Sequence, residues 1–194
     1  MCYLSRMTNQ LVQSPRFDNT PLTVKIADSE EEFEQIFSLN YHTFVEEIPQ
    51  HEPNDAKRLR DKFHENNTYL ICKDGGNIAA MVACCGKRPF SLEAKVERLD
   101  DFLPPHTKAH EIRLLAVRDE YRHTNVIALL MRALLKHLLD QSVDLAVISG
   151  TTRQLPMYRK LGFKPFHELV GRDGALYQPM CMSVDDLRTS RRLK

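Results

Sequence analysis

Hydrophobic positions along the chain follow two different periods, which predicts a mixture of strands and helices. Residues 22–27 alternate apolar and polar side chains and indicate a strand. Residues 68–73 and 77–85 are two apolar runs joined at Asp74-Gly75-Gly76, which is typical of a hairpin. Residues 143–149 are almost continuously apolar, so a strand covered on both faces is expected there.

Helical spacing of apolar residues occurs in two long segments. In the first, Ser29 and Glu32 form a capping box, and the apolar positions behind them continue to Pro49. The second begins after Asn125, and its apolar face consists of Val126, Ile127, Leu130, Met131, Leu134, Leu135, Leu138 and Leu139.

Shorter elements complete the predicted order. Residues 55–63 and 152–161 suit short helices, the second ending at the C-cap Gly162, and residues 86–109 read as a long surface connection. Further strands are predicted at 110–117, 163–169 and 175–182. The predicted order is β-α-α-β-β-loop-β-α-β-α-β-β, without an internal repeat.

Composition limits the classes of protein that fit. The 194 residues suit one domain, with 42% hydrophobic and 27% charged residues, and the net charge of +1 gives no case for binding nucleic acid or an anionic membrane. No apolar run approaches the ~20 residues of a membrane span, and MCYLSRMTNQ has no signal-peptide core. These features predict a cytoplasmic protein whose five cysteines stay reduced.

The same patterns predict the domain boundaries. Residues 1–20 are polar and are expected to be poorly ordered, residues 21–184 form the domain, and residues 185–194 form a basic C-terminal tail.

The first candidate for chemistry is the strand–turn–helix over residues 111–140. A helix N-terminus offers free N–H groups and the positive end of a dipole, so the turn from Arg122 to Ile127 can hold a pyrophosphate, with Arg122 adding charge. The turn has no glycine, however, and taken alone it is more simply an ordinary connection between a strand and a helix.

A second segment changes that interpretation. Val117-Arg-Asp-Glu-Tyr121-Arg122, followed one strand later by Tyr158-Arg-Lys-Leu-Gly-Phe163, resembles the GNAT superfamily of acyl-CoA-dependent N-acyltransferases, in which V-x-x-x-[YF]-R runs into a [QR]-x-x-G-x-[GA] turn. The resemblance covers roughly residues 22–182. It implies an α+β fold in α/β/α layers, with a mixed, mostly antiparallel sheet and a splayed strand pair that holds the acyl thioester. It also implies acyl-CoA, with acetyl-CoA favoured, as co-substrate and no metal.

The resemblance assigns the cofactor contacts to the strand end and the turn. In the turn, Asn125 and Ile127 stand where the family has small residues that let the backbone approach the pyrophosphate. Asparagine tolerates unusual backbone angles, whereas the β-branched Ile127 is expected to crowd the cofactor. The predicted contacts are Leu115, Ala116, Val117, Arg122, His123, Thr124, Asn125, Val126 and Ile127, with Thr151 where the family often has asparagine.

Glu111 and Tyr158 are the predicted catalytic residues. Glu111-Ile-Arg-Leu-Leu-Ala-Val117 resembles the strand of GNAT histone acetyltransferases whose glutamate is the general base, which an amine of pKa about 10 requires at neutral pH. In the family, a tyrosine placed like Tyr158 protonates the leaving thiolate. The alternatives are a strand-end glutamate in solvent, a half-buried packing tyrosine, and His110 as the base.

A further resemblance opens a second enzyme class. Asn40-Tyr-His-Thr-Phe44-Val45-Glu46-Glu47 resembles the [LR]-[RN]-Y-x-x-F-V-x-E segment of GNAT-like enzymes that make acyl-homoserine lactones or N-acyl amino acids from acyl carrier protein. The arginine signatures of that branch are missing. Ala80-Met-Val-Ala83 lacks one arginine, and Arg113 follows Glu111 by two residues rather than three, which predicts that it points to the other face of the strand.

The sequence therefore favours transfer of an acetyl or other short acyl group to a small-molecule or peptide amine. A long-chain N-acyl amino acid synthase that uses acyl carrier protein or acyl-CoA is the first alternative. A thioester-binding module without catalysis is the second, because the turn lacks glycine.

Metal binding is not predicted from the spacing of possible ligands. His106 and His110 are four residues apart, but Pro104-Pro105 precede His106 and a strand follows, so the two histidines do not share a helix face. Cys84 or Cys85 would need a nearby histidine to act as a nucleophile, and the sequence identifies none.

Overall fold

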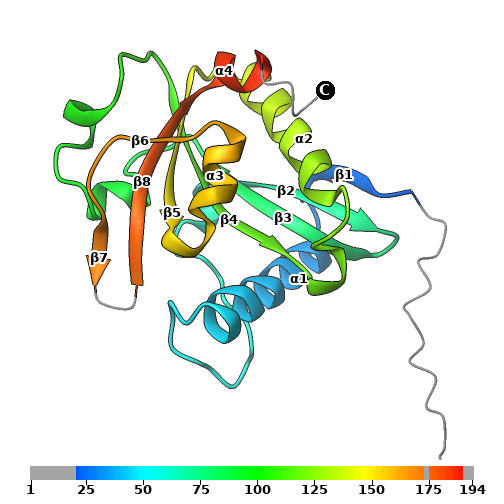
Figure 1. The fold of residues 1–194 in the computed structure, drawn as a ribbon. Helices are drawn as coiled ribbons and strands as arrows, with labels where there is room; N and C mark the ends of the chain where they lie inside the picture. The colour runs from blue at the N-terminus through cyan, green and yellow to red at the C-terminus, as the bar shows by residue number, and fades with distance from the viewer. Residues whose placement is uncertain (1–20, 173–174, 190–194) are drawn as a thin grey trace, which may run out of the picture.

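One mixed sheet organises the protein, as the computed structural model of residues 21–172 and 175–189 shows (Figure 1). The strand order is β1-β2-β3-β4-β5-β8-β6, with β7 also paired to β8, and only β4 and β5 run parallel. The strands are β1 Thr23–Ile26, β2 Asn67–Asp74, β3 Asn77–Cys85, β4 Ala109–Val117, β5 Leu145–Thr151, β6 Lys164–Pro165, β7 Val170–Arg172 and β8 Ala175–Ser183.

Helices cover both faces of the sheet. Helix α2 packs in the larger apolar core together with α4, whereas α1 packs in a separate core on the opposite face. The α-helices are α1 Glu30–Tyr41, α2 Val126–Asp140, α3 Leu155–Leu161 and α4 Val184–Thr189; a π-helical turn, η1 His42–Glu47, continues α1. Short 3₁₀ turns are η2 His64–Asn66, η3 Ser91–Ala94, η4 Leu99–Phe102, η5 Asp119–Tyr121 and η6 Thr152–Gln154. This arrangement confirms the predicted α+β fold.

The ends of several helices follow the sequence signals. The Ser29 side chain accepts a hydrogen bond from the Glu32 backbone N–H, and the Glu32 carboxylate accepts one from the Asp28 N–H, which fixes the start of α1. Gly162 ends α3 in the left-handed region, at φ 107°, as expected for a C-cap glycine.

Strands β4 and β5 separate after a short parallel pairing. Their register ends at Glu111 opposite Val147. On the other side of β4, Arg113 pairs with Ala83 and Ala116 with Met81, so Leu114 and Leu115 oppose a single residue of β3. This bulge places Leu114 at φ 52°, a conformation that a leucine rarely adopts, and bulges bend the strand that carries them. The splayed strand pair that the resemblance implied is therefore present.

Some predicted elements differ in the structure. The strand expected over residues 163–169 is replaced by the short strand β6 at Lys164–Pro165 and by β7, which begins at Val170. Residues 55–63 are not helical, because their backbone groups have other partners. The Leu59 N–H donates to the Phe37 carbonyl, and the side chain of Asn54 bonds both the N–H and the carbonyl of Arg58. The basic tail was expected to begin at residue 185, but α4 reaches Thr189 and buries Leu187 in the main core.

The limits of the domain are only partly visible. Residues 1–20 and 190–194 lie outside the described chain, and so do the expectations about them.

Within the described ranges, the helices are too short or too polar to cross a membrane. The four cysteines there, Cys72, Cys84, Cys85 and Cys181, are buried and unpaired.

Candidate active site

A cavity of about 530 Å³ opens where β4 and β5 separate, a volume usual for small-molecule sites. Its walls come from both faces of the sheet, since Met131 of α2 and Asn40 of α1 both line it. It therefore joins two chambers of different chemistry through the gap between the splayed strands.

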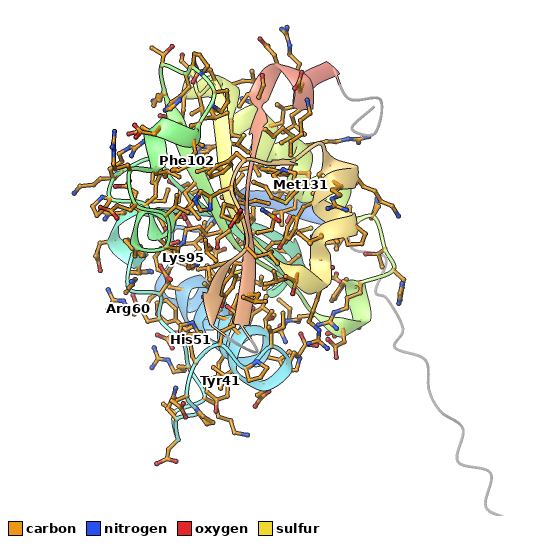
Figure 2. The ribbon with its side chains drawn as sticks, turned by 60° about the vertical axis from the view of Figure 1, so that its left-hand side comes forward. Tyr41, His51, Arg60, Lys95, Phe102 and Met131 are labelled. Carbon is orange, nitrogen blue, oxygen red and sulfur yellow. The ribbon has the colours of Figure 1, made fainter. Side chains whose placement is uncertain are left out.

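The apolar chamber lies between the splayed strands and helices α2 and α3. It is lined by Ile112, Leu115, Met131, Leu134, Ile148 and Leu161, among others. These side chains belong to the main core or pack against it. In the view of Figure 2, Met131 lies apart from the labelled Arg60 and Lys95. Such a surface excludes water and suits an alkyl chain.

The polar chamber lies on the opposite face. It is lined by Arg60, Asp61, Lys62, Lys95, Glu111, Arg113 and Ser149, which come from the loop before β2, from η3 and its C-cap, and from the splayed strands. Lys95 donates to the Ser149 hydroxyl at 2.9 Å and lies 4.2 Å from the centre of the Tyr177 ring. Among the described residues, neither Lys95 nor Lys62 forms an ion pair. Burial lowers the pKa of Lys95 below its usual value of 10.5, and the nearby Glu111 carboxylate opposes the shift.

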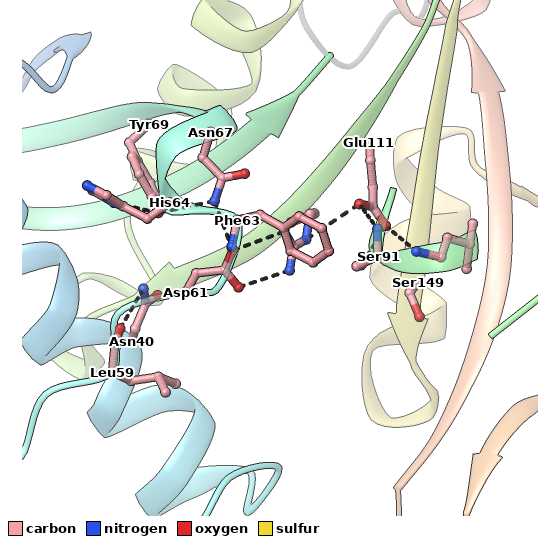
Figure 3. Close-up of polar contacts among 12 residues, drawn as sticks. Asn40, Leu59, Asp61, Phe63, His64, Asn67, Tyr69, Ser91, Glu111 and Ser149 are labelled. Carbon is pink, nitrogen blue, oxygen red and sulfur yellow. Dashed lines mark hydrogen bonds and ion pairs between the residues drawn. The ribbon is translucent and has the colours of Figure 1, made fainter. Parts of the chain in front are cut away.

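Glu111 lies on the wall between the chambers and is 1% exposed. Its carboxylate accepts hydrogen bonds from the Ser91 N–H at 2.8 Å, the Ser91 hydroxyl at 2.7 Å and the Leu92 N–H at 3.0 Å (Figure 3). The alternative of a strand-end glutamate in solvent is therefore wrong. Glu111 anchors η3 beside the cavity, and its role as a general base stays a prediction.

Arg113 and Asp61 form a bidentate ion pair across the polar chamber. Nη1 lies 3.0 Å from Oδ1 and Nη2 lies 2.9 Å from Oδ2, while Nε lies 3.6 Å from Glu111. The Phe63 ring lies under the guanidinium at 4.5 Å. Arg113 lies on the same face of β4 as Glu111, because residues i and i+2 share a face of a strand and the bulge begins only after Arg113. It therefore points to the other face than a residue three positions after Glu111 would in a regular strand, as predicted. The pair fixes the loop before β2 to β4.

Tyr158 lines the cavity from α3. Its ring lies against Gly150 of β5 so closely that an added Cβ there would meet ring atoms at 2.9 Å. Burial raises the pKa of the phenol above its usual value of 10, and Thr151 opposes the shift. The hydroxyl therefore stays protonated at neutral pH, which is the form that a proton donor requires.

His110 does not reach the cavity. It is buried behind β4, where its Nδ1 lies 3.2 Å from the Cys84 sulfur, and burial lowers its pKa to about 4. It is not among the residues that line either chamber, which argues against His110 as the base for an amine bound there.

The predicted phosphate turn is exposed at the start of α2. Arg122 contacts both carboxylate oxygens of Glu47 at 2.6 Å and Asp119 at 2.8 Å. Asn125 has φ −81°, so the backbone there does not need a glycine, and Ile127 packs against the main core. The Val126 N–H donates to the Thr124 hydroxyl, so the free donors that α2 offers to an anion are the N–H groups of Ile127 and Ala128.

The structure brings together part of the predicted site. Glu111, Leu115, Thr151 and Tyr158 line the cavity. The other predicted contacts lie outside the lining: Val117, Ala116, Arg122, His123, Thr124, Asn125, Val126 and Ile127. Ala116 packs in the core around α1.

Sequence reasoning missed the polar residues contributed by connections. Asp61 lies in a loop, Lys95 at the end of a 3₁₀ turn and Glu47 in a π-helical turn. Hydrophobic periodicity identifies apolar faces and does not show which polar residues reach a cavity. One signal was available: Glu47 belongs to the segment that resembles the long-chain branch.

Comparison with known proteins agrees with this geometry. A model of the acetyltransferase (GNAT) family matches residues 31–163, so this chain belongs to the GNAT family. Among curated proteins, none matches the chain.

Solved structures share the fold at low identity. A CoA-dependent acyl-homoserine lactone synthase, BjaI, solved with SAM and isopentyl-CoA, has a TM-score of 0.69 and 22% identity over 84% of this chain and 79% of that one. FeeM, an N-acyl amino acid synthase from uncultured soil microbes, has a TM-score of 0.70 and 14% identity over 87% and 94%. A putative N-acetyltransferase from Lactobacillus plantarum has a TM-score of 0.62 and 14% identity over 84% and 98%. The chain is an acyltransferase enzyme by family, and these structures support the fold.

Proposed function

We propose that the protein joins a medium- or long-chain acyl group, carried as a thioester, to the amine of a small molecule that also bears an anionic group. The observation that carries this proposal is the cavity itself, which joins an apolar chamber to a cationic polar chamber at the gap between β4 and β5. A thioester held in that gap has its alkyl chain on one face of the sheet and the acceptor on the other.

The apolar chamber is the reason for preferring a longer acyl group than the sequence favoured. An acetyl group brings no methylene into this chamber, whereas each buried methylene of a longer acyl chain contributes about 0.8 kcal/mol. BjaI, which is similar in fold, is described as CoA-dependent, so acyl-CoA is the proposed donor. A thioester of acyl carrier protein is the alternative donor.

The polar chamber is the reason for preferring an anionic acceptor. Lys62 and Lys95 line it without ion-pair partners in the described chain, while Asp61 and Glu111 are already engaged by Arg113 and by the start of η3. A carboxylate on the acceptor would neutralise this charge. FeeM, with the same fold, makes N-acyl amino acids, and a free amino acid is the simplest acceptor of this kind.

The proposed reaction is direct transfer. Before the attack, the ammonium group of the acceptor gives one proton, through water, to Glu111, which later releases it to solvent. The amine nitrogen attacks the thioester carbonyl carbon, and the carbonyl oxygen gains negative charge beside the backbone of Leu115, beyond the point where β4 stops pairing with β5. As the C–S bond breaks, Tyr158 donates its proton to the sulfur, and the second proton of the nitrogen returns through water to the Tyr158 oxygen. The products are an amide and a free thiol.

Thiol release tests this proposal against a binding module. With octanoyl-CoA and a mixture of amino acids, we expect thiol release that depends on both substrates and amide product in equal amount. A binding module would instead show a rise in melting temperature with octanoyl-CoA and no turnover with any amine, which would refute the proposal.

Arg122→Ala is expected to raise the KM for acyl-CoA about tenfold with a smaller effect on kcat, because a phosphate contact contributes to ground and transition states alike. Glu47→Gln is the matched variant, since it removes one of the two carboxylates that Arg122 contacts and should lower the same KM. Steady-state kinetics with varied donor measures both. An unchanged donor KM in Arg122→Ala would show that the turn does not bind the donor.

Lys95→Met is expected to raise the KM of an amino acid acceptor about tenfold, because the alkyl stem stays while the charge is lost. The methyl ester of the same amino acid should react equally with wild type and variant. Arg60→Met is the control, since Arg60 lines the same chamber but is paired with Glu65. Equal acid and ester KM values in the wild-type protein would contradict an anionic acceptor.

A further inference from the structure

A cluster of three possible metal ligands lies outside the cavity, where the proposed reaction does not use it. Cys84 of β3, His110 of β4 and His137 of α2 each offer one ligand atom, and these atoms lie within 4.8 Å of one another. None of the three lines either chamber. The cluster therefore needs an explanation of its own.

The sheet register brings the first two side chains together. Cys84 pairs with Ile112, so His110 is its diagonal neighbour on the same face of the sheet. The His110 ring lies over Gly86, where an added Cβ would meet Nε2 at 2.4 Å. Because only glycine leaves room there, the imidazole is held with Nδ1 directed at the Cys84 sulfur, 3.2 Å away.

The third side chain comes from the helix that covers this face. His137 is half-buried near the C-terminal end of α2, whereas Cys84 and His110 are buried. The cluster thus has one side open to the surface, through which an ion could enter and a water molecule could complete four ligands.

We infer that Cys84, His110 and His137 bind a single zinc ion. One thiolate and two imidazoles are a donor set that zinc prefers, and three protein ligands with one open position are typical of tetrahedral zinc. Bond lengths of about 2.3 Å to sulfur and 2.0–2.1 Å to nitrogen place the two ligand atoms about 3.6 Å apart, close to the separation of Cys84 and His110. A spacing rule cannot find this site, because its ligands come from three separate elements.

The protonation states fit with one proton released on binding. A neutral imidazole binds zinc without losing a proton. A thiol gives its proton to solvent as the zinc–thiolate bond forms. Of the charged neighbours, Lys108 opposes a cation and Asp140 favours one. The ion would tie β3, β4 and α2 together.

Metal retention by the full-length protein tests the inference. After incubation with zinc and dialysis, we expect one zinc per chain by elemental analysis, a higher melting temperature than after chelation, and a thiolate-to-metal charge-transfer band when cobalt replaces zinc. His137→Ala changes a half-exposed helix residue, so it should fold, and it should lose all three signals. Cys84→Ser should lose the charge-transfer band.

Two controls separate this cluster from other ligands. Cys85→Ser removes the adjacent thiol, which bonds the Lys87 carbonyl, and should bind zinc as wild type does. His42→Ala removes a ligand of the second cluster, His42, Glu47 and Asp119, and should also be unchanged. No stoichiometric zinc in the wild-type protein, or equal retention in His137→Ala, would overturn the inference.

Discussion

Replacing Tyr158 with phenylalanine is expected to lower kcat by roughly ten- to a thousand-fold, the range of a lost general acid or somewhat below it. The ring that packs on Gly150 stays, so the fold and the donor KM should change little. Because the raised pKa of Tyr158 keeps the phenol protonated at neutral pH, the loss should appear across the neutral range rather than only at high pH. Single-turnover thiol release measures the effect on the chemical step directly.

Tyr177→Phe is the matched control for this variant. Tyr177 also lines the cavity, but its ring faces Lys95 in the polar chamber. Its loss of a hydroxyl should change kcat by no more than a few-fold. If Tyr158→Phe keeps full activity, Tyr158 is a packing residue and another group must protonate the thiolate.

Filling the apolar chamber is expected to shorten the acyl group that the enzyme accepts. Met131→Trp places an indole where the chamber is lined by a flexible methionine. If the ring displaces four methylenes of the acyl chain, a long-chain donor loses about 3 kcal/mol of binding free energy, which lowers its kcat/KM about 200-fold. Activity with acetyl-CoA should stay within a few-fold of wild type, so the ratio between long and short donors is the quantity to measure.

Leu139→Trp is the matched control, because Leu139 lies on the same helix, is 42% exposed and does not line the cavity. It should leave the preference for chain length unchanged. Equal loss with acetyl-CoA and long-chain donors in Met131→Trp would indicate general damage to the fold, and no change with either would show that acyl chains bind elsewhere.

The parts of the structure that follow local rules could be predicted from the sequence. Ser29 and Gly162 mark helix ends because each satisfies a backbone requirement within a few residues, and the α2 face repeats at helical spacing over 15 residues. The splayed strand pair was expected only through the family resemblance. The bulge at Leu114 that bends β4 could not be predicted, because no glycine marks it in the sequence.

The polar contacts of the site could not be predicted in this way. Arg122 meets Glu47 across 75 positions of sequence, and Arg113 meets Asp61 across 52. Such partners are chosen by tertiary packing, so neither periodicity nor spacing identifies them. Glu111 lines the cavity, but its three hydrogen bonds to η3 depend on a connection that the sequence pattern described only as irregular.

One measurement tests the central claim, that a cavity joining an apolar and a cationic chamber makes this GNAT protein a long-chain N-acyltransferase for an anionic amine. The purified protein is incubated with acyl-CoAs from acetyl to hexadecanoyl and a mixture of free amino acids, products are identified by mass spectrometry, and kcat/KM is determined for each chain length. The account predicts N-acyl amino acids and a kcat/KM that climbs from acetyl to at least octanoyl. Acetyl-CoA as the best donor, or amide formed only with amines that lack a carboxylate, would contradict it.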